Sequence, residues 1–154
     1  MFRFTLIWLM AIASWFVYPV EAGGNTGTVT EVIRGDIVTI GESFTARLTG
    51  VKVLTSDSSE IGERILNFAK EELQGSLVKL FTWTTDNTAA GIVYDSNDYP
   101  FVTIYYGENF EKCFNEILLS KGFAEVDTLW LPQDRLYYMD LEKHARENGL
   151  GIWK

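Results

Sequence analysis

The chain has 154 residues and a formal net charge of −8, from 21 acidic and 13 basic side chains. Because Lys and Arg contacts to phosphates supply most nucleic-acid affinity, this balance argues against a nucleic-acid partner. A single cysteine, Cys113, excludes an intramolecular disulfide. We expect a buried thiol there, with an intermolecular bridge as the alternative.

The first 22 residues have the features of an export signal. Arg3 supplies a positive start, and residues 4–20 are nearly all apolar, with a proline near the end of the run. Val20 and Ala22 then place small residues where a signal peptidase cleaves. We therefore predict that residues 1–22 are a signal peptide, that the protein is secreted to the extracellular space, and that no membrane attachment remains after cleavage. A retained membrane anchor is the alternative, because the apolar run is just long enough to span a bilayer.

The remaining chain reads as one folded domain, residues 28–154, after a polar and glycine-rich lead at residues 23–27 that we expect to be flexible. Short Gly-containing turns separate the first apolar segments and predict an antiparallel meander. Its strands are expected over residues 28–33, 37–40 and 44–53.

A helix is predicted next. Asp57 can cap its first turn while Glu60, three residues on, completes a capping box, and apolar residues then follow at helical spacing until Gly75. Further strands are expected over residues 76–84, 92–94 and 100–106, with an oxygen-rich solvated turn at residues 95–98.

Two more helices close the chain, over residues 109–121 and 133–147, with an extended segment at residues 126–131 between them. Gly122 is a typical residue after the end of a helix. In the last helix we expect an inward face made of Leu136, Tyr137, Leu141, His144 and Ala145.

Several short motifs now stand in a characteristic order. They are Arg34-Gly35-Asp36-Ile37 in the first turn, Arg47-Leu48-Thr49-Gly50-Val51 in the third strand, Gly62 to Phe68 in the first helix, Asn115 to Val126 around the second, and Gly151-Ile152-Trp153 at the close. Their order and spacing resemble the staphylococcal nuclease (thermonuclease-like) family over about residues 28–154. The resemblance implies an α+β fold, a five-stranded OB-type β-barrel with three packed α-helices.

That family hydrolyses phosphodiester bonds with the help of calcium, carboxylate ligands, a general-base glutamate and two arginines. The resemblance places Asp36 at the first carboxylate and Arg47 at the first arginine. Lys52 stands where the second carboxylate is expected, and Thr55 stands where the general base is expected. We therefore interpret Asp36 and Arg47 as remnants of a catalytic site.

By the same resemblance, the second arginine of the family is also missing from this chain. Asp86 fits the start of the family's Asp-x-Tyr-Gly-Arg turn, which puts Ala90 at the arginine position. Trp130 stands where the family has an aromatic residue near its nucleotide pocket, and it is the one binding candidate from this resemblance.

The charge change at Lys52 argues against a metal, because an ammonium replaces a carboxylate where a divalent cation would bind. We expect instead that Lys52 or Arg47 pairs with Asp36 in an internal salt bridge. The alternative is that Asp57 or Glu60 moves into the site, so that Asp36 and Asp57 are weak metal candidates.

These observations favour a secreted, catalytically inactive domain (a pseudonuclease) that acts as a binding or interaction module. We expect a monomer with a protein or ligand partner and no cofactor. The alternative is a weak calcium-dependent nuclease acting on DNA or RNA, the one case in which Ca²⁺ would be needed. A third possibility is nucleic-acid binding without cleavage, which the net charge of −8 disfavours.

Overall fold

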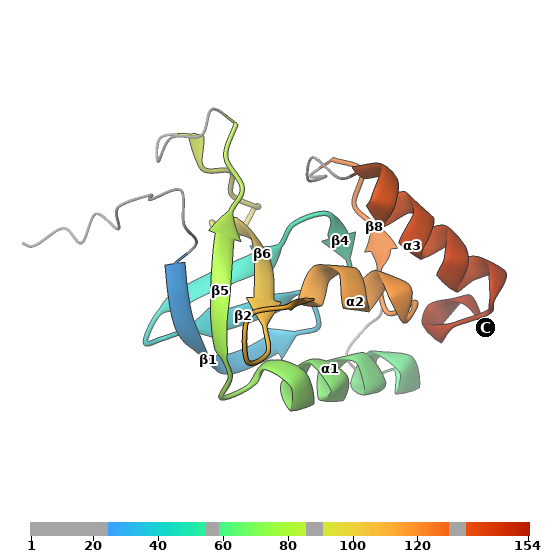
Figure 1. Ribbon diagram of the computed structural model, residues 1–154, viewed down its shortest axis with the longest axis horizontal. Coiled ribbons are helices and arrows are strands. Elements are labelled where there is room, and N and C mark those ends of the chain that lie inside the picture. Colours follow the sequence, from blue (N-terminus) through green and yellow to red (C-terminus); the bar gives the residue numbers. More distant parts are fainter. Residues whose placement is uncertain (1–24, 55–58, 86–90, 130–134) are drawn as a thin grey trace, which may run out of the picture.

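The computed structural model describes residues 25–54, 59–85, 91–129 and 135–154, arranged as a barrel with three helices (Figure 1). The predicted signal peptide and the positions of Thr55, Asp57, Ala90 and Trp130 lie outside these ranges, so the roles expected for them stay predictions. Within the described ranges, no helix has the length and apolar character needed to cross a membrane.

Five strands close into the barrel in the order β3-β2-β1-β5-β6. Neighbours in this order pair antiparallel, and a parallel pairing of β3 with β6, with Arg47 opposite Phe101, closes the ring. The strands are β1 (Asn25–Arg34), β2 (Ile37–Ile40), β3 (Phe44–Leu48), β5 (Leu77–Thr82) and β6 (Phe101–Tyr106). The expected five-stranded barrel is confirmed, and with its three helices the fold is α+β.

Strand β1 has two partners and is longer than the sequence predicts. Residues 25–28 pair with β5, and the residues from Val29 onward pair with β2. Register shifts after Val29 and after Val32 are bulge-like irregularities, which bend a strand and so help it serve both neighbours. The strand therefore begins at Asn25, and the expectation of a flexible lead at residues 23–27 is wrong for its last three residues.

Two other strand predictions also change. The expected strand 44–53 is broken, because β3 ends at Leu48 and Gly50 has a positive φ of 72°. Strand β4 (Val51–Lys52) then pairs with β8 (Glu125–Val126) in a separate two-stranded sheet. The expected strand 92–94 makes isolated bridges instead.

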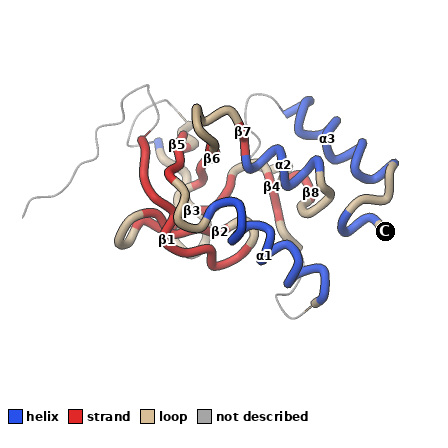
Figure 2. Tube along the Cα trace, turned by 60° about the horizontal axis from the view of Figure 1, so that its bottom comes forward, coloured by secondary structure: helices blue, strands red, loops and turns tan. Residues whose placement is uncertain are grey.

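Helix α1 (Glu60–Leu73) lies against β1, as both views show (Figures 1 and 2). Its cap is Ser59, whose Oγ accepts a hydrogen bond from the N–H of Gly62 at 3.0 Å, and Glu60 is its first residue; Asp57, which the predicted capping box places at the cap, lies outside the described residues. The predicted apolar face is confirmed, since Ile65, Ala69 and Leu73 are all buried in the core.

Helix α2 is shorter than expected, and helix α3 ends at Glu147 as predicted. Helix α2 (Phe114–Ser120) follows a two-residue strand, β7 (Lys112–Cys113), which pairs with the end of β6. Helix α3 (Arg135–Glu147) packs on α2 and turns Tyr138 and Ala145 inward, with Leu141 partly buried. The predicted inward face is therefore confirmed at Ala145 and wrong at three positions: Leu136 is 73% exposed, Tyr137 is 48% exposed, and His144 is also exposed.

Asn115, at the start of α2, is a fully buried polar side chain that ties the helix to the barrel. Its Oδ1 accepts a hydrogen bond from the N–H of Ile104 at 3.1 Å. Its Nδ2 donates to the carbonyls of Thr49 at 2.9 Å and Val102 at 3.2 Å. One side chain thus holds together α2, β6 and the end of β3.

We expect Asn115→Ala to lower the free energy of unfolding by about 3 kcal/mol, because a buried polar group left without its partner costs about 1–3 kcal/mol. The matched control is Asn67→Ala, the same truncation at an exposed position of α1, which should change stability by less than about 0.5 kcal/mol. Urea unfolding of both variants measures the difference. Equal midpoints would contradict the structural role of Asn115.

Candidate functional site

Asp36 lies in the tight turn between β1 and β2, and its side chain is fully buried. Its backbone carbonyl accepts a hydrogen bond from the N–H of Leu48 at 2.9 Å, which joins the turn to the end of β3. The preceding Gly35 is needed because a Cβ there would lie 2.6 Å from Ile65 of α1. A buried carboxylate on such a turn requires a partner for its charge.

Arg34 is that partner. Its Nε lies 2.5 Å from Oδ1 of Asp36, and its Nη2 lies 2.9 Å from Oδ2, so the guanidinium binds the carboxylate with two parallel hydrogen bonds. Such two-point pairs are among the strongest hydrogen bonds that proteins form. Sequence reasoning included Arg34 in the turn motif and did not identify it as the partner.

Arg47, on β3, is a second cation at the same carboxylate. Its Nε lies 3.7 Å from Oδ2 of Asp36, and its Nη1 lies 3.6 Å from Oδ2 of Asp95. The expected pairing of Arg47 with Asp36 is therefore confirmed, and Arg47 also bridges to a second acid. We call Arg34, Asp36, Arg47 and Asp95 the ion cluster, in which two positive and two negative charges compensate each other.

The expected solvated turn at residues 95–98 is confirmed for its last three residues, which are exposed, and is wrong for Asp95, of which only 3% of the side chain is exposed. Its Oδ1 accepts hydrogen bonds from the N–H groups of Asn97 at 2.8 Å and Tyr99 at 3.0 Å. Asp98 in this turn has a positive φ of 60°, which is uncommon outside glycine. One acid therefore fixes the backbone before β6 and holds Arg47.

Lys52 does not join this cluster. It lies on β4 opposite Glu125, and its side chain is exposed while Val51 and Val53 on either side are buried. Among the described residues, it forms no ion pair with Asp36. The backbone N–H of Val53 instead donates to Oδ2 of Asp36 at a long 3.5 Å.

Other candidates contribute no metal site to the described part of the chain. Glu60 is the exposed first residue of α1, and no three His, Cys, Asp or Glu side chains in the described ranges group closely enough to hold a metal ion. Thr55, Asp57, Ala90 and Trp130 fall outside those ranges.

Cys113 is buried and unpaired with another cysteine, as expected for a structural thiol. Burial raises the pKa of the Cys113 thiol to about 11, although a hydrogen bond with Tyr138 acts in the opposite direction. Since the thiolate is the reactive form, the thiol is poorly suited to nucleophilic chemistry at neutral pH.

A comparison with protein families matches residues 45–154 to the family described as Staphylococcal nuclease homologue. The matched range includes Arg47, Lys52 and all three helices, and it begins after the turn that carries Arg34 and Asp36. No curated protein matches the chain in a sequence comparison.

We expect Arg34→Ala to lower the free energy of unfolding by about 2–3 kcal/mol. Removing one partner of a fully buried pair costs about 3–5 kcal/mol, and the partial exposure of Arg34 reduces this. Arg64→Ala, which removes an exposed arginine of α1, is the matched control and should change stability by less than about 0.5 kcal/mol. Chemical denaturation measures both variants.

A double variant tests whether the two groups act as a pair. Arg34→Ala combined with Asp36→Asn should destabilise the protein by less than the sum of the single changes, because the same interaction is lost once. Strict additivity would contradict the pairing.

Proposed function

The chain belongs to the staphylococcal nuclease family, and on that premise we propose that it is a secreted member without nuclease activity that acts by binding a partner. The observation that carries this proposal is the guanidinium of Arg34 on both oxygens of the buried Asp36. The carboxylate that the motif resemblance assigns to calcium is held by a cation of the chain itself.

The described residues do not fit a calcium ion. Calcium takes 6–8 oxygen ligands, and both oxygens of Asp36 are already bound by Arg34. A calcium ion would have to displace the Arg34 guanidinium, and within the ion cluster it would find carboxylate oxygens only from Asp36 and Asp95. Lys52, which stands where the resemblance expects a second carboxylate, is exposed on β4 and supplies no oxygen ligand.

The catalytic groups beyond the metal also support inactivity. By the motif resemblance, Thr55 stands in place of the general-base glutamate, and a threonine hydroxyl cannot serve as a base at neutral pH. The loss of charge-stabilising donors such as the second arginine commonly lowers rates by about a hundredfold or more.

The turn that carries the second arginine has two candidate positions in this chain. The first runs from Asp86 and ends at Ala90. The second runs from Asp95, and its fourth residue, Asp98, has the positive φ that suits the glycine of the family turn. The fifth position then holds Tyr99, so neither placement supplies an arginine.

The alternative function is a weak calcium-dependent nuclease. Arg47 favours it, since a family arginine remains on β3 with 19% of its side chain exposed. Its guanidinium lies within 3.7 Å of the carboxylates of Asp36 and Asp95, whose negative charges disfavour a phosphate at the same place. Binding of nucleic acid without cleavage is disfavoured by the net charge of −8.

Residues 23–154 should cleave neither single-stranded DNA nor RNA in a manner that depends on calcium. The measurement is gel analysis of both substrates with calcium or with a chelator, using staphylococcal nuclease as the active control. Calorimetry on the same sample should detect no calcium binding of micromolar strength.

If cleavage or calcium binding is observed, two variants show whether it comes from the candidate site. Chelator-sensitive cleavage that disappears in both Asp36→Ala and Arg47→Ala would establish the nuclease alternative and overturn the proposal. Calcium binding abolished by Asp36→Ala would overturn the internal salt bridge as the replacement for the metal.

Export is tested on the full chain expressed in a secreting host. We expect the protein in the medium with a mass corresponding to a start at Gly23, because Val20 and Ala22 suit the cleavage enzyme. Ala22→Trp should block this cleavage while leaving the apolar run intact. Full-length protein retained in the membrane fraction would favour the anchor instead.

A further inference from the structure

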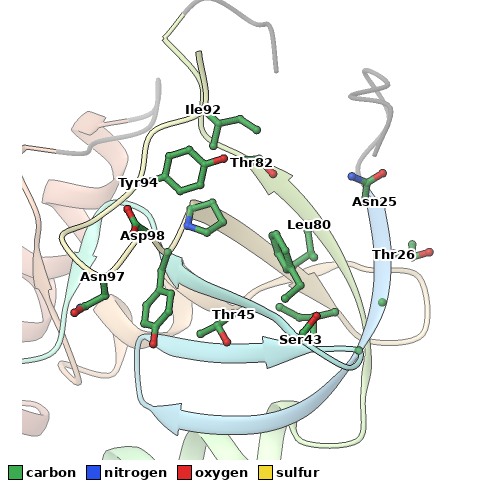
Figure 3. Close-up of a pocket in the computed structure, with 16 residues that line it drawn as sticks. Asn25, Thr26, Ser43, Thr45, Leu80, Thr82, Ile92, Tyr94, Asn97 and Asp98 are labelled. Atoms are coloured by element: carbon green, nitrogen blue, oxygen red, sulfur yellow. The ribbon is translucent and has the colours of Figure 1, made fainter. Parts of the chain in front are cut away.

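A cavity of about 730 Å³ lies at the mouth of the barrel, away from the side chains of the ion cluster. It is formed by the start of β1, the turn between β2 and β3, the end of β5 and the segment that leads into β6. Figure 3 shows Ile92 and Tyr94 on one side of this space and Ser43 and Thr45 on the other. Small-molecule sites in proteins have volumes of roughly 300–1,000 Å³ and often occupy barrel mouths.

The lining of this barrel-mouth cavity is apolar with hydrogen-bonding groups placed around it. Its apolar side chains include Ile40, Phe44, Leu80, Ile92, Tyr94 and Pro100, and the hydroxyls of Ser43, Thr45 and Thr82 lie among them. Asp98 is the one described lining residue that is charged at neutral pH. Because the described lining has a carboxylate and no Lys or Arg, the cavity disfavours anionic ligands such as nucleotides.

The wall formed by residues 95–100 is held in a defined conformation. Its first residue, Asp95, binds two backbone N–H groups of the same segment and pairs with Arg47. At its other end, the carbonyl of Pro100 accepts a hydrogen bond from the N–H of Arg47 at 3.0 Å. Between them, Asp98 keeps a positive φ of 60°. Unfavourable backbone conformations persist where the surroundings enforce them, and they concentrate at binding sites.

We propose that the barrel-mouth cavity binds an uncharged, ring-containing apolar small molecule. The size of the cavity accommodates a molecule of several rings, and the half-exposed ring of Tyr94 offers a face for stacking. The hydroxyl groups can orient one polar end of such a ligand. This site does not include Asp36 or Arg34, so it stands independently of whether the protein has nuclease activity.

A matched pair of fluorescent probes tests both the site and its charge preference. Phenylnaphthylamine is uncharged, and anilinonaphthalene sulfonate has the same rings with an added negative charge. We expect the uncharged probe to bind one site per chain, at least about tenfold more tightly than the sulfonate, which corresponds to about 1.4 kcal/mol. Asp98→Asn, which tolerates the positive φ, should strengthen binding of the sulfonate and leave binding of the uncharged probe nearly unchanged.

Filling variants locate the site. Thr82→Trp places a large ring in the cavity from β5. Thr45→Trp places the same ring there from β3, so that the test can proceed if one of the two variants fails to fold. Either should reduce binding of the uncharged probe by about tenfold or more. Ile33→Trp adds the same ring at an exposed position of β1 outside the lining and should bind as the unmodified protein does.

Circular dichroism and thermal unfolding establish that the variants are folded. The proposal would be overturned if the uncharged probe did not bind to the protein. It would also be overturned if every folded filling variant bound this probe as tightly as the unmodified protein does. Equal affinity for the two probes would overturn the assignment of an uncharged ligand.

Discussion

The carboxylate of Asp36 is the constraint around which this end of the barrel is organised. It is fully buried, so its charge must be compensated inside the protein. Arg34 does this from β1 and Arg47 from β3, while the backbone of Asp36 bonds to Leu48 at the end of β3. Arg47 also lies opposite Phe101 in the parallel pairing of β3 with β6 that closes the barrel. Strand β3 therefore both closes the barrel and carries one of the cations that compensate Asp36.

A guanidinium and a calcium ion hold a carboxylate in different ways, and this difference supports the proposed function. Calcium can leave and return, and it keeps coordination positions for substrate oxygens. A guanidinium that is part of the chain contributes its bonds permanently and uses its planar edge on the carboxylate. In our proposal, Arg34 makes Asp36 a structural residue, and the family's fold is retained while its chemistry is lost.

Sequence patterns predicted the features that depend on local spacing. The apolar face of α1 follows from its helical period, and the end of α2 follows from Gly122, which has a positive φ of 66°. Features that depend on distant partners were missed. The early start of β1 requires pairing with β5, and the burial of Asp95 requires Arg47 on another strand. In α3, the pattern predicted an inward face that includes Leu136 and Tyr137, whereas the packing of this helix on α2 buries Tyr138.

The segment from Asp95 to Pro100 belongs to two regions at once. Its acidic side chain and its last carbonyl hold Arg47, and its middle residues line the barrel-mouth cavity. Suppose that a ligand binds the cavity more tightly when this segment is fixed by its contacts with Arg47. By thermodynamic reciprocity, binding of that ligand must then stabilise the contacts between the segment and Arg47. Through its contacts with this segment, Arg47 physically connects the ion cluster to one wall of the cavity, which is the kind of connection that allosteric communication requires.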